Sequence, residues 1–124
     1  MQLDSVYGVV LAGGSGTRFW PKSRHTSPKQ LCAIGPQPAT MLEVTLRRLD
    51  SLVSPAQRLI VTHTDQASAT RVVVGSRCPA IIAEPMAKNT AAALALAALD
   101  IQSRSGRLDT VMVSIHADHV ITNE

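Results

Sequence analysis

The residues best suited to chemistry lie near the start of the chain, where an apolar run ends in closely spaced glycines. Val9-Val10-Leu11-Ala12 is followed by Gly13-Gly14-Ser15-Gly16-Thr17-Arg18. Glycines let backbone N–H groups approach an anion, because they carry no Cβ and accept positive φ angles. No Asp or Glu occurs between Asp4 and Glu43, but four basic residues do: Arg18, Lys22, Arg24 and Lys29. The segment therefore predicts a site for a phosphate-bearing ligand.

The two common nucleotide-binding patterns do not describe this loop. A Walker loop ends in Gly-Lys-Ser/Thr, and no such tripeptide follows Gly13. The dinucleotide fingerprint requires a glycine three positions after Gly16, where this chain has Phe19. The loop must therefore be of another kind.

A second segment whose residue types could bind a ligand runs from Glu84-Pro85 to Asn89-Thr90. A carboxylate such as Glu84 can accept hydrogen bonds from N1–H and the N2 amino group of guanine together, a pairing that adenine does not offer. The structural alternative makes Glu84 a solvated strand-end carboxylate and Asn89 a simple helix cap. Base recognition becomes the better hypothesis because a phosphate loop precedes this segment.

A third segment, His116-Ala117-Asp118-His119, places a carboxylate after an apolar run. Mg²⁺ binds through one or two carboxylates together with substrate phosphates, so Asp118 is the expected metal ligand. The competing hypothesis is a zinc cluster of His116, Asp118 and His119, which lacks a nearby fourth ligand for tetrahedral coordination.

The three segments together resemble the signature of the sugar-phosphate nucleotidyltransferases, and most closely the branch that uses GTP and mannose 1-phosphate. The resemblance rests on Leu-Ala-Gly-Gly-x-Gly-Thr-Arg-Phe-Trp-Pro, Ser-Pro-Lys-Gln, Glu-Pro-x-x-Lys-Asn-Thr and Ala-Asp-His. It implies transfer of GMP from GTP to mannose 1-phosphate, giving GDP-mannose and pyrophosphate. It further implies that Arg18 and Lys29 contact phosphates and are catalytic, and that Asp118 binds Mg²⁺. The nucleotide-binding residues that it implies are Leu11, Ala12, Gly13, Gly14, Ser15, Gly16, Thr17, Arg18, Lys29, Glu84, Pro85, Asn89 and Thr90.

The chain also departs from the family pattern. His116 stands where the family usually has proline, and the family's catalytic domain is much longer than 124 residues. We therefore expect residues 1–124 to be the N-terminal, nucleotide-binding part of a nucleotidyltransferase domain, without the sugar-phosphate pocket. The alternatives are a GTP-binding fragment without turnover, or a nucleotidyltransferase for another base and hexose 1-phosphate.

The amino-acid composition argues against several other classes of protein. Aromatic residues make up 2% of the chain and the formal net charge is only +3, which does not favour nucleic-acid binding. Two cysteines, Cys32 and Cys78, are too few for a disulfide framework. Since no apolar run reaches the roughly 20 residues of a membrane span and no signal peptide is recognisable, we expect a cytoplasmic protein that does not contact membranes.

Short apolar runs alternate with helical patterns along the chain. Strands are expected at 7–12, 58–62, 80–83 and 110–115, each apolar enough to be covered on both faces. Helices are expected after a Thr40–Glu43 capping box, at 65–74 with an ambiguous Val72-Val73-Val74, and from Asn89 or Thr90 to Gly106. The last helix is apolar all round, which predicts burial.

This alternation predicts an α/β fold, a Rossmann-like three-layer α/β/α arrangement with a mainly parallel sheet. Ligands of such sheets bind outside the carboxyl ends of the strands. Gly13, Glu84 and Asp118 each follow a predicted strand, so they should converge on that edge. The sheet should end in an open apolar edge, for which we expect poor solubility or a homodimer.

Overall fold

The computed structural model describes residues 4–13, 33, 39–86 and 90–117. The strands are β1 (Val6–Leu11), β2 (Arg58–His63), β3 (Ala80–Glu84) and β4 (Val111–His116). The helices are α1 (Met41–Arg48), α2 (Thr64–Val74) and α3 (Thr90–Ser105), with short 3₁₀ turns η3 (Pro55–Gln57) and η4 (Gly75–Arg77). Each predicted strand and helix is therefore confirmed, with strand boundaries that differ by one residue.

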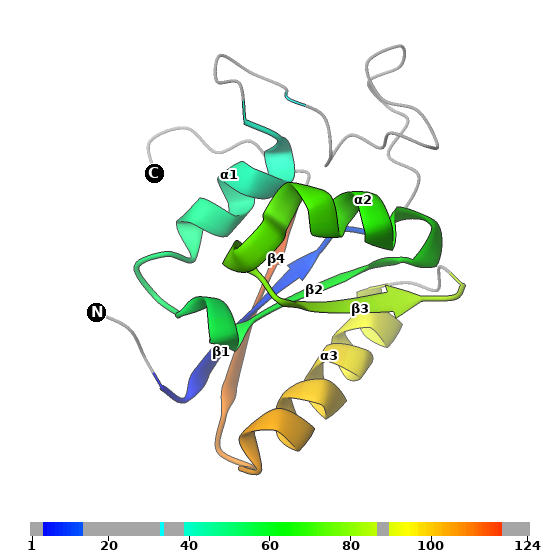
Figure 1. The fold of residues 1–124 in the computed structure, drawn as a ribbon. Coiled ribbons are helices and arrows are strands. Elements are labelled where there is room, and N and C mark those ends of the chain that lie inside the picture. Colours follow the sequence, from blue (N-terminus) through cyan, green and yellow to red (C-terminus); the bar gives the residue numbers. More distant parts are fainter. Residues whose placement is uncertain (1–3, 14–32, 34–38, 87–89, 118–124) are drawn as a thin grey trace.

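The four strands form one parallel sheet in the order β3-β2-β1-β4. The chain moves from β1 to β2 to β3 in one direction and then returns past β1 to reach β4. Right-handed crossovers in opposite directions place their helices on opposite faces, which is why α1 and α2 cover one face and α3 the other (Figure 1). The predicted three-layer α/β/α architecture is confirmed.

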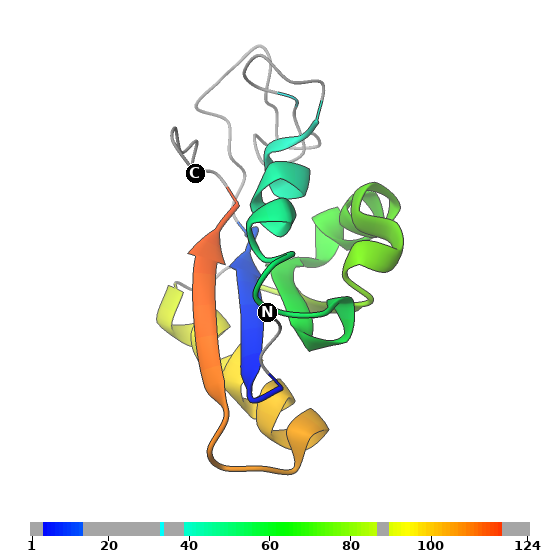
Figure 2. The same cartoon turned by 90° about the vertical axis from the view of Figure 1, so that its left-hand side faces the viewer.

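Side chains alternate between two cores along each strand, as the two-residue period of a strand requires. Val10 and Ile60 face α1 and α2, where they pack with Leu42 and Leu46. Their neighbours Val9 and Leu59 point to the other face and pack with Ala97 and Ile101 of α3. The central strands β1 and β2 thus bury side chains on both faces of the sheet, in the middle of the fold (Figure 2).

Local sequence signals explain where the helices begin and end. Thr40 and Glu43 form a reciprocal capping box at the start of α1, with Glu43 N donating to Thr40 Oγ1 at 3.1 Å and Thr40 N donating to Glu43 Oε2 at 2.7 Å. Gly106 adopts φ 64° directly after α3, a conformation that other residues rarely take. Helix α2 extends through Val74, so the ambiguous valines are helical.

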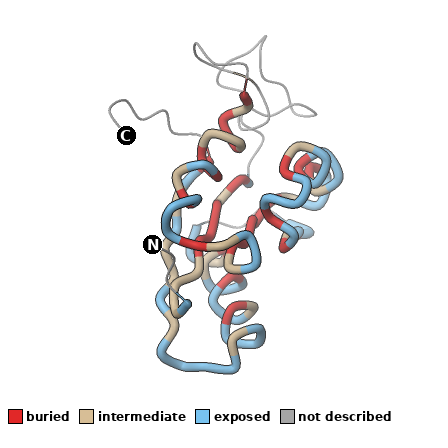
Figure 3. Tube along the Cα trace, turned by 60° about the vertical axis from the view of Figure 1, so that its left-hand side comes forward, coloured by how far each residue is buried: buried red, intermediate tan, exposed pale blue. Residues whose placement is uncertain are grey.

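Two expectations of burial are wrong. Helix α3 buries only Ala93, Ala97 and Ile101, while Leu99 is 65% exposed. Figure 3 shows buried and exposed segments interspersed along the chain trace. The apolar outer face of α3 has no covering layer among the described residues, because a three-layer fold buries only the inner stripe of each helix. Strand β4 is likewise exposed at Val111, Ser114 and His116, and it is the last strand at its edge of the described sheet.

Two further expectations can be compared with the described residues. Cys78 is a free, buried thiol, and burial raises its pKa to about 11, so it is an inert core residue. None of the helices in the described ranges is long and apolar enough to span a bilayer.

Candidate functional site

The carboxyl ends of all four strands meet at one edge of the sheet. In the register of the ladders, Leu11 pairs with Val61 and with His116, and His63 pairs with Glu84. The sheet also reverses its strand order at β1, which has β2 on one side and β4 on the other. Such a switch point is where open α/β sheets bind ligands, so the topology alone marks this edge as the candidate site.

The first residues of the glycine segment are held by both neighbouring strands. Ala12 N donates to Val61 O at 2.9 Å, and Ala117 N donates to Leu11 O at 3.0 Å. A third hydrogen bond joins the fully buried hydroxyl of Thr62 to the carbonyl oxygen of Ala12, at 3.0 Å. Ala12 is buried and Gly13 is exposed, so the segment emerges from the sheet at Gly13 from a fixed backbone.

The side chain of Glu84 reaches this emerging segment from the far side of the sheet. Glu84 is the last residue of β3, which is separated from β1 by β2. Nevertheless, a Cβ added to Gly13 would lie 4.0 Å from Glu84 Oε1. The carboxylate therefore extends across the end of β2 and lies beside the glycine segment. Glu84 is only 8% exposed, so the residue that carries this charge is largely buried.

Gly13 is close to this carboxylate without being sterically required at its position. A Cβ there would make only an ordinary van der Waals contact with Glu84 Oε1, at 4.0 Å.

Sequence reasoning missed the contribution of β2 to this edge. Thr64 Oγ1 donates to the backbone oxygen of Glu84 at 2.9 Å and fixes the end of β3, as Thr62 fixes the start of the glycine segment. A signal is present in the sequence, because two threonines and a histidine directly follow the apolar run Leu59-Ile60-Val61. It is weaker than a glycine or a carboxylate at the same place, since a threonine there is common without any role in binding.

His63 lies between these two threonines and caps α2. Its Nδ1 accepts a hydrogen bond from Asp65 N at 3.2 Å and lies 3.4 Å from Asp65 Oδ2. The His63 side chain thereby satisfies a backbone N–H in the first turn of α2.

The structure therefore brings together part of the predicted site. Leu11, Ala12, Gly13 and Glu84 share the edge, with Pro85 exposed after β3 and Thr90 exposed as the first residue of α3. The remaining predicted site residues lie outside the described residues: Gly14, Ser15, Gly16, Thr17, Arg18, Lys29, Asn89 and Asp118. The binding and catalytic roles of all the site residues stay predictions.

A metal site at this edge stays a prediction, because its expected ligand, Asp118, lies outside the described residues. Within the described ranges, no three His, Cys, Asp or Glu side chains are grouped closely enough to hold a metal ion. The zinc hypothesis involves Asp118 and His119, which lie outside those ranges. Ala117, immediately before Asp118, is hydrogen-bonded to Leu11 at the base of the glycine segment. One carboxylate that follows this anchor in sequence, combined with phosphate oxygens, is the ligand chemistry that Mg²⁺ prefers.

Comparison with known proteins gives consistent results. Residues 7–124 match the family described as Nucleotidyl transferase. The chain is 39% identical to a mannose-1-phosphate guanylyltransferase of Escherichia coli K12, over 100% of this chain and 26% of the relative. It is 36% identical to the xanthan biosynthesis protein XanB of Xanthomonas campestris, over 98% of this chain and 26% of that protein.

A solved structure shares the fold. The crystal structure described as mannose-1-phosphate geranyltransferase from Thermus thermophilus superposes with a TM-score of 0.79 and 32% sequence identity. The match covers 94% of this chain and 33% of the other. The chain thus spans about a quarter of the length of these curated relatives and a third of this solved chain.

Proposed function

This chain belongs to the nucleotidyl transferase family, and on that premise we propose that it forms the nucleotide-binding part of a mannose-1-phosphate guanylyltransferase. Such an enzyme transfers GMP from GTP to mannose 1-phosphate and releases pyrophosphate. The observation that carries the proposal is the buried Glu84 carboxylate beside Gly13, at the switch point of the sheet. The names of the relatives support the choice of acceptor.

Glu84 supplies the base preference in this proposal. A buried carboxylate accepts hydrogen bonds and donates none, so it favours a ligand edge with two adjacent donors. Guanine offers N1–H and the N2 amino group at that edge, whereas adenine presents an N1 acceptor that the carboxylate would repel. Thr64 donates to the backbone oxygen of Glu84, which holds the strand end that carries this carboxylate.

The triphosphate then follows the glycine segment away from the base. In the proposal, the backbone N–H groups of residues 14–16 bind phosphate oxygens, and Arg18 and Lys29 neutralise their charge. A phosphate oxygen of mannose 1-phosphate attacks the α-phosphorus of GTP. The bond from that phosphorus to the bridging oxygen of the β-phosphate breaks, and pyrophosphate leaves. Positioning and charge neutralisation carry such a reaction.

Asp118 is the proposed ligand of Mg²⁺, which would withdraw charge from the triphosphate when bound. Ala117, the residue before Asp118, donates its backbone N–H to Leu11 O, at the end of the strand that leads into the glycine segment. This hydrogen bond supports the proposal that a ligand at position 118 acts on a nucleotide bound at that segment.

A second candidate is GTP binding without turnover by the 124-residue chain. It is favoured by the span of the chain, which covers only 26% of the first curated relatives. An acceptor pocket supplied by the remaining length of those relatives would be required for transfer. The two candidates share the nucleotide site and differ only in whether pyrophosphate is released.

Two assays test the proposal in sequence. With Mg²⁺ present, GTP at about 100 times its Kd should stabilise the chain by about 2.7 kcal/mol, which corresponds to roughly 10 °C in Tm for this size. Smaller shifts with ATP and dTTP are expected. Pyrophosphate release from GTP and mannose 1-phosphate then separates transfer from binding alone. No stabilisation by GTP, or a larger shift with ATP or dTTP, would contradict the proposal.

In a form of the protein that releases pyrophosphate, Arg18→Ala should lower the rate about 10²- to 10³-fold, as loss of one oriented donor typically does. Arg104→Ala is the matched control, since Arg104 lies in the last turn of α3 and pairs with Asp100. Equal rates for the two folded variants would remove Arg18 from the catalytic residues.

A further inference from the structure

A cavity of about 490 Å³ lies away from the candidate nucleotide site, between the ends of α1 and α2 and the start of β2. Its lining residues come from two stretches of chain, 47–58 and 76–77, and three of the six are arginines. They are Arg47, Asp50, Pro55, Arg58, Ser76 and Arg77. Arg58 begins β2 and His63 ends it, so five residue steps of about 3.3 Å separate this cavity from the carboxyl edge by about 16 Å. The two sites are therefore distinct.

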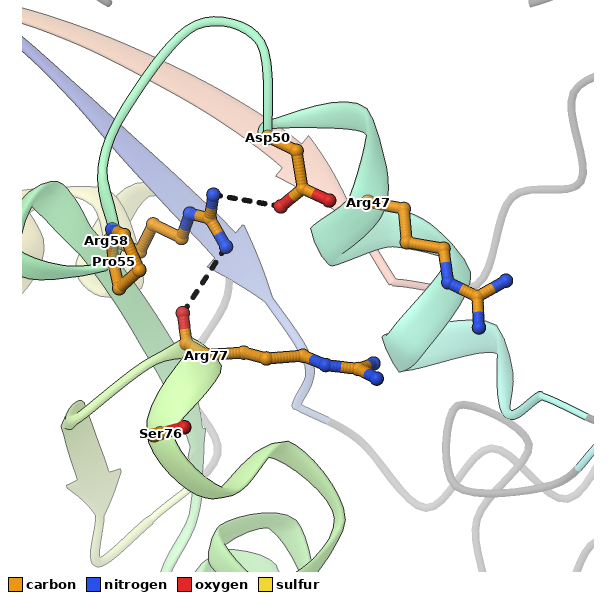
Figure 4. A pocket seen from close by; sticks show the side chains of 6 residues that line it. All are labelled: Arg47, Asp50, Pro55, Arg58, Ser76 and Arg77. Atoms are coloured by element: carbon orange, nitrogen blue, oxygen red, sulfur yellow. Dashed lines mark hydrogen bonds and ion pairs between the residues drawn. The ribbon is translucent and has the colours of Figure 1, made fainter.

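Arg58 forms the fixed floor of this cavity. It is 4% exposed, and its guanidinium is held from three directions (Figure 4). Nη2 donates to Val53 O at 3.0 Å and pairs with Asp50 Oδ1 at 2.8 Å, while Nη1 donates to Arg77 O at 3.3 Å. Its Nε is buried without a hydrogen-bond partner among the described residues. The acid of the cavity lining, Asp50, is thus committed to the buried arginine.

Arg47 and Arg77 are the exposed cations of the cavity. Arg47 projects from the last turn of α1 and Arg77 from η4, and Figure 4 shows both side chains extending to the same side. Arg77 Nη1 lies 3.8 Å from Glu43 Oε1, a long ion pair, and the capping box at Thr40 already uses the other oxygen of Glu43. The three arginines of the lining face two acids, Asp50 and Glu43, which leaves one net positive charge. Arg47 and Arg77 are both exposed to solvent.

We propose that this cavity is a second anion site, which binds a phosphate group between the guanidinium groups of Arg47 and Arg77. A guanidinium fork matches two oxygens of a tetrahedral phosphate, and two forks from separate walls match all four. The Ser76 hydroxyl on the cavity wall adds a neutral donor. The proposal does not depend on the function proposed for the carboxyl edge, because it uses none of the same residues.

A titration with inorganic phosphate tests this proposal. The Nε–H NMR signals of the arginines are the readout, because they report which arginines the phosphate approaches. We expect the Arg47 and Arg77 signals to shift together and to saturate with one Kd. Sodium chloride at matched ionic strength should not reproduce those shifts. A linear shift that never saturates, or equal shifts with chloride, would overturn the proposal.

Two variants sharpen the test. Arg77→Ala should weaken phosphate binding about tenfold or more, as followed by the Arg47 signal. Arg47→Ala should do the same when followed by the Arg77 signal. Arg71→Ala removes an exposed arginine of α2 that does not line the cavity, and it should leave the affinity unchanged. Circular dichroism verifies that each variant is folded, and retained affinity in both folded cavity variants would overturn the proposal.

Discussion

Replacing Thr62 by valine tests whether the sheet holds the glycine segment in place. Thr62 is fully buried, and its hydroxyl donates to the carbonyl oxygen of Ala12 at 3.0 Å. Removing a donor from a buried acceptor costs about 1 to 3 kcal/mol, whereas the added methyl group contributes about 0.8 kcal/mol of apolar burial. We expect Thr62→Val to lower the free energy of unfolding by about 1 to 2 kcal/mol.

Thr45→Val is a matched control within the same chain. Thr45 is also fully buried, and its hydroxyl donates to Met41 O at 2.8 Å. Met41 O, however, also accepts the backbone N–H of residue 45 within α1, so it keeps a donor after the substitution. The control should therefore change the free energy of unfolding by less than about 0.5 kcal/mol.

Urea denaturation of both variants measures this difference, and equilibrium GTP binding shows whether it reaches the site. Thr62→Val should weaken GTP binding because the base of the glycine segment loses one of the hydrogen bonds that anchor it to the sheet, while Thr45→Val should not. Equal unfolding free energies for the two variants, or unchanged GTP affinity in Thr62→Val, would refute the reasoning.

Two further predictions concern the core. In Gly8→Ala the new Cβ would lie 2.8 Å from Leu49 Cδ1, so the overpacking cost of about 1 to 3 kcal/mol should outweigh the gain of about 0.4 to 1 kcal/mol from a stiffer unfolded chain. Urea denaturation should show a net loss of about 1 to 2 kcal/mol, and a stabilised variant would contradict the packing. The raised pKa of Cys78, about 11 against 9.0, favours the neutral thiol in the folded state. The free energy of unfolding should therefore fall by on the order of 2 to 3 kcal/mol as pH rises from 9 to 11, relative to that of Cys78→Ala. If the free energies of unfolding of the two proteins changed equally with pH, the Cys78 thiol would make no such contribution.

Most of the architecture was predictable because local signals and hydrophobic period agree. The Thr40–Glu43 capping box and Gly106 mark helix boundaries by backbone chemistry that needs no tertiary context. Burial was less predictable. An all-apolar pattern does not say whether a further layer covers α3, and the exposure of Leu99 depends on what lies outside this helix rather than on its sequence.

The candidate site was predictable in part for a similar reason. The strand ends that carry Gly13 and Glu84 converge because parallel strands must align their carboxyl ends. That the Glu84 side chain crosses the end of β2 to reach Gly13 depends on side-chain direction, which a sequence pattern does not encode. Thr62 and Thr64 were not predicted because a threonine at a strand end is ordinary in composition, and only its hydrogen-bond partner gives it a role.

The central claim is that the Glu84 carboxylate recognises guanine, by accepting hydrogen bonds from it, beside the glycine segment. The most direct measurement compares the Kd of GTP with that of ITP, which keeps N1–H but lacks the 2-amino group, for the unmodified chain and Glu84→Gln. Asp109→Asn, which neutralises an exposed carboxylate before β4, is the control for the change in charge.

We expect the unmodified chain to bind GTP about tenfold more tightly than ITP. Glu84→Gln should weaken GTP binding about 10- to 100-fold, because charged hydrogen bonds are lost, and should bring the two affinities together. Asp109→Asn should keep the preference for GTP. A Glu84→Gln variant that is folded, binds GTP as the unmodified chain does and still prefers GTP to ITP would contradict the account.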